Sequence, residues 1–177
     1  MMKMENKIDE AYKKVIRIKI FLMFLIFGIA MGLPLTVVGG VLGWGFPDPF
    51  GMMGALKAML FVGLALLMAL PILGLLIGGV MATKAYDNFS YQLQSDGVFI
   101  RSGIITKTQR IIPYKKIQNL TVVSGLLERK YGLSSIMIET AGGAIYRGVS
   151  YPEGVIPGIR EPEPIVKEIR SRMEESK

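Results

Sequence analysis

The residues from Ile20 to Pro47 read IFLMFLIFGIAMGLPLTVVGGVLGWGFP and include no charged side chain. A second uncharged run, AMLFVGLALLMALPILGLLIGGVMAT, extends from Ala58 to Thr83. About 20 apolar residues in an α-helix are enough to cross the hydrocarbon core of a bilayer, which is roughly 30 Å thick. Buried helices of soluble proteins seldom stay uncharged over such a length, and the apolar part of a cleaved signal peptide is shorter. The two runs therefore predict two transmembrane helices.

The basic residues outside these runs predict how the chain is oriented. One group precedes the first run: Lys3, Lys7, Lys13, Lys14, Arg17 and Lys19. The connection, residues 45–57, contains only Lys57, and every other basic residue follows Thr83. Because lysine and arginine near helix ends stay on the cytoplasmic side, we expect an integral cell membrane protein with both termini in the cytoplasm. The predicted parts are a basic amphipathic cytoplasmic segment (1–19), a transmembrane hairpin (20–83) with the outer loop 45–57, and a cytoplasmic domain (84–177).

Residues 6–19, ahead of the first run, have the pattern of a short amphipathic helix. Ile8, Tyr12 and Val15 fall on one stripe of such a helix, with lysines elsewhere. We expect this segment either to lie along the membrane or to extend the first span into the cytoplasm. Basic flanks of this kind attract anionic lipid headgroups, and they also act as a plain topology signal.

Small residues recur at helical spacing inside both runs, and they predict close helix packing. The glycines concerned are Gly28, Gly32, Gly39, Gly43, Gly74 and Gly78. Such pairs let helix backbones approach closely in lipid, either between the two helices of one chain or between protomers. Pro34 and Pro71 are expected to kink the helices. Neither run contains an ionisable residue, which argues against an ion or proton path through them.

After Thr83 the pattern changes to short alternating segments separated by turn residues, as in an antiparallel sheet. We expect strands over residues 89–94, 98–101, 104–112, 117–123, 134–140 and 144–149. A helical turn is expected over 125–132, a connection rich in proline and glycine over 152–162, and a final helix over 163–175. The predicted fold class is thus two transmembrane α-helices followed by an α+β domain, a β-sandwich or partial barrel with a carboxy-terminal helix.

Several blocks of this second half resemble one known family. They are Tyr91–Leu93 with the turn Asp96-Gly97 and Ile100–Ile104, then RIIPYKKIQ (110–118), GLLERKYGL (125–133) and IETAGG (138–143). Over about residues 85–175 the chain resembles the bacterial pleckstrin-homology-like domain of the membrane-flanked type, which also has paired helices in front. The resemblance implies two packed sheets, a carboxy-terminal helix and a role in binding or assembly. It implies no activity.

The predicted domain departs from lipid-binding pleckstrin-homology domains in its first hairpin loop. That loop, Gln94–Gly97, contains Asp96 and no lysine, which argues against specific phosphoinositide binding. The short tether still keeps some basic residues within a Debye length, about 8 Å, of anionic headgroups. The candidates for lipid contact are Lys13, Lys14, Arg17, Lys19, Lys84, Lys107, Arg110, Lys115 and Lys116. The alternative is that they form a solvated surface.

The chain contains no histidine and no cysteine, which removes the commonest general base and metal ligands. Glu128, Glu139 and Glu153 form no recognisable catalytic pair, and Glu128 with Arg129 suggests a local ion pair or cap. We therefore predict no catalytic residue, metal or cofactor. The net charge of +7 is partly a topology signal, so we do not expect nucleic acid as a partner.

The function expected from these patterns is a membrane-anchored, non-enzymatic binding or scaffolding module for a protein partner or for self-assembly. Two alternatives stay open. One is an accessory subunit of a transporter or secretion system, and the other is an enzyme acting at the membrane surface.

Overall fold

The computed structural model describes residues 6–45, 53–140, 145–146, 149–150 and 152–176. The chain divides into two compact units. One unit is Ile16–Met81, which is helical, and the other combines Met1–Val15 with Ala82–Lys177. We call them the helical unit and the soluble unit, and each is described by itself.

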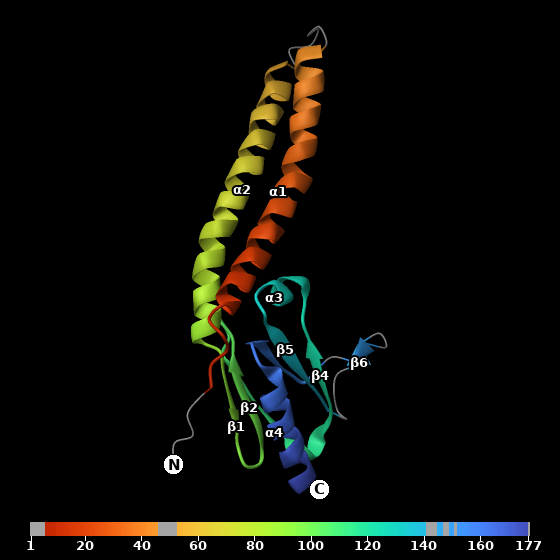
Figure 1. The fold of residues 1–177 in the computed structure, drawn as a ribbon. Helices are drawn as coiled ribbons and strands as arrows, with labels where there is room; N and C mark the ends of the chain where they lie inside the picture. The colour runs from red at the N-terminus through yellow and green to blue at the C-terminus, as the bar shows by residue number, and fades with distance from the viewer. Residues whose placement is uncertain (1–5, 46–52, 141–144, 147–148, 151, 177) are drawn as a thin grey trace. The chain divides into compact units, whose positions relative to one another are not determined.

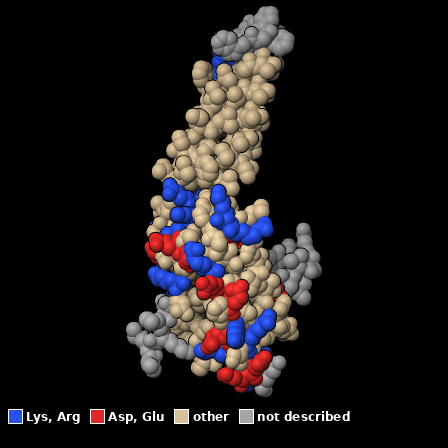
Figure 2. Space-filling view, in the orientation of Figure 1, with Lys and Arg blue, Asp and Glu red and all other residues tan. Residues whose placement is uncertain are grey.

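The helical unit consists of most of α1 (Tyr12–Gly45) and α2 (Met53–Asp87), which continue through Pro34 and Pro71. Both helices are long and apolar enough to cross a membrane. Only 11% of the most apolar window of each helix is buried within the protein, whereas a core helix of a soluble protein would be mostly buried. Figure 2 shows a long surface of uncharged side chains on this unit.

The soluble unit contains two three-stranded antiparallel sheets and a carboxy-terminal helix (Figure 1). The first sheet has the order β1 (Ser90–Leu93), β2 (Gly97–Ser102) and β3 (Thr108–Pro113). The second has the order β4 (Ile117–Val123), β5 (Ser134–Thr140) and β8 (Gly154–Ile159). The remaining elements are the 3-10 helix η1 (Tyr114–Lys116), α3 (Leu126–Lys130), the paired strands β6 (Ile145–Tyr146) and β7 (Val149–Ser150), and α4 (Pro162–Glu175).

The core of the soluble unit lies between the two sheets and beneath α4. A Cβ atom on Gly154 of β8 would lie 2.9 Å from Cδ1 of Ile100 in β2, so the second sheet packs closely on the first. Ile136 in β5 and Ile169 in α4 are fully buried in the same cluster. Pro162 begins α4 at a position where the missing N–H costs nothing, because the first helical donors have no partner within the helix. The predicted fold class is confirmed.

Within the soluble unit, the segment before α1 packs on the first sheet and on β8 instead of forming the helix predicted from residue 6. The backbones of Asn6 and Tyr91 exchange two hydrogen bonds of 3.0 Å, which extends the first sheet beyond β1. The Asp9 amide donates to the Gly158 carbonyl at 2.9 Å, and Ile8 is buried in the core. Helix α1 begins only at Tyr12, because residues 6–9 are used in these long-range contacts.

The Asp9 carboxylate also accepts a hydrogen bond of 2.9 Å from Arg160, the residue that follows β8. This bond, together with the one from the Ala11 amide, holds the pKa of Asp9 below its ordinary value. Asp9 is therefore ionised at neutral pH, and the ion pair helps to hold the amino-terminal segment on the soluble unit.

Two further elements differ from the prediction. Strand β8 lies where a connection was expected, and it contains Pro157. Proline is tolerated there because β8 is an edge strand and its pairing with β5 shifts register near Ser134. The strand expected from residue 104 begins at Thr108, because Gly103 adopts φ +114° and starts a turn. The expected strand over 144–149 corresponds in part to β6 and β7.

Candidate functional site

A hollow of about 130 Å³ in the soluble unit brings three cationic side chains together. It is lined by Lys7, Asp87, Asn88, Ser90, Arg101 and Lys107, and we call it the basic hollow. Ser90 and Arg101 face each other across β1 and β2, while Lys107 comes from the turn before β3. The residues that line it thus include three cationic side chains and one carboxylate, together with a hydroxyl and a side-chain amide. Such a set of donors suits a phosphate or another anion.

The basic hollow lies where the soluble unit continues into the two apolar runs. Asp87 is the last residue of α2 and follows Thr83, the end of the second run, by about one helical turn. The start of α1 is at the same place, because the Lys13 ammonium lies 4.2 Å from the centre of the Tyr86 ring. The lining residues are thus only a few residues along the chain from a predicted membrane boundary.

The structure separates the predicted lipid-contact residues into groups. Lys107 lines the basic hollow, while Lys14, Arg17, Lys19 and Lys84 are exposed on the ends of α1 and α2. Lys13 is half-buried and pairs with Glu10 at 2.9 Å. Arg110 in β3 donates to the Glu153 carbonyl at 2.8 Å. Lys115 and Lys116 follow the far end of β3, roughly 20 Å from Lys107 by strand length.

Lys7 and Arg101 were not predicted from the sequence as members of this group of cations. The pairing of β1 with β2 places Arg101 opposite Ser90, close in sequence to the end of α2. The turn at Asp96-Gly97 predicts a hairpin, and counting outward from that turn would have paired these two residues. For Lys7 no local signal exists, because its position depends on the pairing of Asn6 with Tyr91.

The predicted helix-packing glycines face the partner helix within the helical unit. A Cβ atom on Gly28, Gly32 or Gly39 of α1 would lie within 3.5 Å of α2, and one on Gly74 or Gly78 of α2 would lie within 3.5 Å of α1. Gly63 of α2, which was not among the predicted packing residues, lies in the same contact opposite Gly32. Gly43 is in α1, but its surroundings are outside the described residues.

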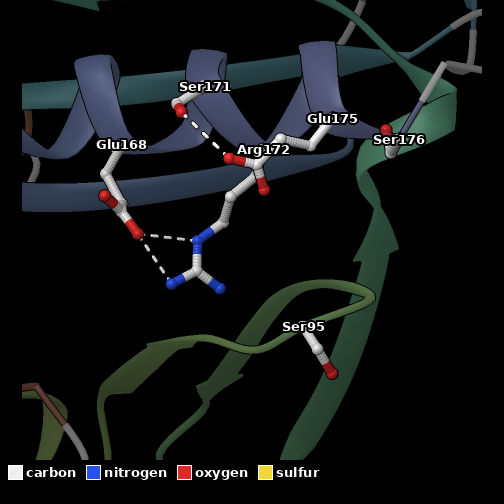
Figure 3. Close-up of a pocket in the computed structure, with 6 residues that line it drawn as sticks. All are labelled: Ser95, Glu168, Ser171, Arg172, Glu175 and Ser176. Atoms are coloured by element: carbon white, nitrogen blue, oxygen red, sulfur yellow. Dashed lines mark hydrogen bonds and ion pairs between the residues drawn. The ribbon is translucent and has the colours of Figure 1, made fainter.

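A second, larger hollow of about 580 Å³ lies between α4 and the first hairpin (Figure 3). It is lined by Ser95, Glu168, Ser171, Arg172, Glu175 and Ser176. Nε of Arg172 donates to Glu168 at 2.7 Å, and Nη1 donates to the Gln94 carbonyl, also at 2.7 Å. The bond to Glu168 raises the pKa of Arg172.

The same Gln94 carbonyl accepts a hydrogen bond of 3.0 Å from the buried Tyr114 hydroxyl, whose pKa is raised by burial. Arg172 and Tyr114 thus fasten the carboxy-terminal helix and η1 to the loop after β1. The guanidinium is engaged in holding the fold, and the side chains around it are serines and glutamates. This hollow is therefore poorly suited to anions.

Two of the three acidic residues considered as candidates, Glu128 and Glu153, have structural roles. The buried carboxylate of Glu128 accepts from the Gly125 amide at 3.0 Å and from the Ser135 hydroxyl at 2.9 Å, which confirms a cap on α3. The Glu153 carboxylate accepts from the Thr140 hydroxyl. Among the residues that the structure describes, no group of three or more Asp or Glu side chains could hold a metal ion.

Comparison with known proteins identifies the class to which this arrangement belongs. Residues 15–176 match the family model of the bacterial PH domain, where PH stands for pleckstrin homology. The chain therefore belongs to the bacterial PH domain family, as its sequence motifs indicated. The match includes both long helices as well as the soluble unit. No curated protein and no solved structure matches the chain. PH domains are generally non-catalytic binding modules.

Proposed function

We propose that this chain is a membrane-anchored, non-enzymatic binding module whose PH domain accepts a strand from another polypeptide at the edge of β4. The two long helices would anchor it in the cell membrane, with both termini in the cytoplasm. The family supports a binding role, and the structural use of Glu128 and Glu153 supports the absence of catalysis.

The observation that carries this proposal is the contrast between β4 and the other sheet edges. Exposed edges recruit foreign strands, so proteins protect them with charges, prolines, bulges or covering segments. β1 is covered by Asn6, and β8 contains Pro157. β3 contains the charged Arg110 and ends at Pro113.

β4 is seven residues long and contains neither a charge nor a proline. In the part of the chain that the structure describes, β5 is the only strand paired with it. Its end is apolar and uncovered, since Val122 and Val123 are 44% and 38% exposed. Main-chain hydrogen bonds to this edge and contacts with the two valines would bind an extended segment. A second copy is the simplest occupant, because two identical edges can pair about a twofold axis.

A charge placed on this edge is expected to abolish the association. In native-lipid nanodiscs, a photoreactive residue at Thr121 should cross-link the chain to a second copy or to one defined protein. Val122→Lys should reduce this product at least several-fold, because a lysine on the edge opposes strand addition.

The matched control is Gln109→Lys, which adds the same charge to an exposed position of β3. It should leave the cross-link unchanged. If the chain yields only monomeric, uncross-linked product, or if both variants reduce the product equally, the β4 edge is not the binding surface.

A further inference from the structure

Ile105 is the most exposed large apolar side chain of the soluble unit among the described residues, at 92%. It lies at the tip of the turn between β2 and β3, and the backbone holds it there. Gly103 has φ +114°, and a Cβ atom on it would collide with the Thr106 carbonyl oxygen. The turn is therefore tight and directs the chain outward. A singly exposed aliphatic residue is ordinary in soluble proteins, so its surroundings decide what it means.

The surroundings of Ile105 are cationic. Lys107, two residues further on, lines the basic hollow together with Lys7 and Arg101, and of the described residues that line it Asp87 alone is acidic. The exposed Lys84, in the last turn of α2, adds to the positive charge of this end of the soluble unit. An apolar tip beside several cations is the pattern of a segment that enters a lipid interface.

The same end of the soluble unit is where the chain enters both predicted spans. Asp87 and Asn88 both line the basic hollow. Asp87 is the last residue of α2, and Asn88 is the residue after it. Lys7 lies five residues before the start of α1 at Tyr12. Only a few residues of chain therefore separate the hollow from the predicted spans and the headgroups around them. Over so short a distance, salt screens the attraction between the basic side chains and anionic headgroups only weakly.

We propose that the soluble unit docks on the anionic bilayer surface through this end, with Ile105 inserted at the acyl boundary and the basic hollow holding lipid phosphate groups. Long basic side chains reach the phosphate level while an adjacent aliphatic side chain is buried below it. The inference rests on the membrane anchorage proposed above, but not on the β4 edge. The docking end is also distinct from the loop Gln94–Gly97, which lies at the opposite end of the first hairpin.

The absence of native cysteine allows a direct test in the full chain. Ile105→Cys would be labelled with a polarity-sensitive fluorophore in two kinds of nanodisc, one of phosphatidylcholine alone and one also containing phosphatidylglycerol. In the anionic nanodiscs we expect a blue-shifted emission, quenching by spin-labelled lipid, and a several-fold loss of quenching by aqueous iodide. A label at Ser95→Cys, on the opposite hairpin turn, should stay accessible to iodide in both.

The charges are tested in the same assay. The double variant Lys7→Gln with Lys107→Gln should restore most of the iodide quenching at position 105, and so should high salt, since both weaken attraction to the headgroups. The control pair Lys115→Gln with Lys167→Gln removes equal charge from exposed positions elsewhere and should leave the label protected. A label at 105 that is as accessible as that at 95 in anionic nanodiscs overturns the proposal, whatever the β4 cross-link shows.

Discussion

Gly39→Ala is expected to destabilise the helical unit strongly, whereas Gly79→Ala is expected to leave it unchanged or slightly more stable. A Cβ atom on Gly39 would lie 2.6 Å from the Leu56 carbonyl oxygen and 2.9 Å from Cα of Leu60. These are backbone atoms of α2 and cannot rotate away, so the helices must separate. Overpacking of this kind costs about 1–3 kcal/mol, occasionally more.

Gly79 is the matched control because a Cβ atom there would meet nothing within 4 Å. Both changes improve helix propensity by about 1 kcal/mol, so the difference between the variants isolates the contact between α1 and α2. Denaturation of the full chain in detergent, followed by circular dichroism, measures it. Equal stabilities of the two variants, with a change only in oligomeric state, would mean that the glycines pack between protomers instead.

Gly158→Ala is expected to release the amino-terminal segment from the soluble unit. Gly158 has φ +64°, and a Cβ atom on it would lie 2.6 Å from Cγ of Tyr12. The substitution therefore adds two costs, a left-handed backbone conformation of about 1–2 kcal/mol and the displacement of the Tyr12 ring. Displacing that ring also disturbs the bond from the Asp9 amide to the Gly158 carbonyl.

Hydrogen exchange of the full chain measures this release. Protection of the Asn6 and Asp9 amides, which both donate to the soluble unit, should fall by at least tenfold, which corresponds to about 1.4 kcal/mol. Gly132→Ala is the control, because Gly132 has the same φ of +64° but its Cβ atom would approach only the Arg160 side chain, at 3.9 Å. It should lower the stability of the domain without selective loss at Asn6 and Asp9. If both variants lose the same protection, Tyr12 does not hold the segment.

These two experiments test features of different kinds, one anticipated and one not. Close helix packing at Gly39 was expected, since small residues at helical spacing have that role in lipid. The residue pattern could not say whether the partner was the other helix of the same chain. The contact of Gly158 with Tyr12 joins residues 146 positions apart, as their numbers in the chain show. No local pattern reports such a pairing.

The candidate site divides in the same way. The basic character of Lys107 and the absence of lysine in the loop Gln94–Gly97 were evident from residue types. The association of Lys107 with Lys7 was not, because it requires the amino-terminal segment to pair with β1. The difference between the two edges of the second sheet, β4 without proline and β8 with Pro157, likewise became visible only with the strand order. From the sequence, Pro157 had suggested a connection instead of an edge strand.

By itself, the sequence determined the features that depend on composition and local periodicity. An uncharged run such as 20–47 cannot be solvated by water at low cost, and Ile136 and Ile138 of the strand 134–140 are two residues apart because both lie in the buried core. Only the tertiary structure decided where the segment before Tyr12 lies, what Glu128 does and which cations share a hollow. The physical reason is that these three features are stabilised by hydrogen bonds and packing between segments far apart in the sequence. Such contacts form only in the folded chain, so no local pattern of residues reports them.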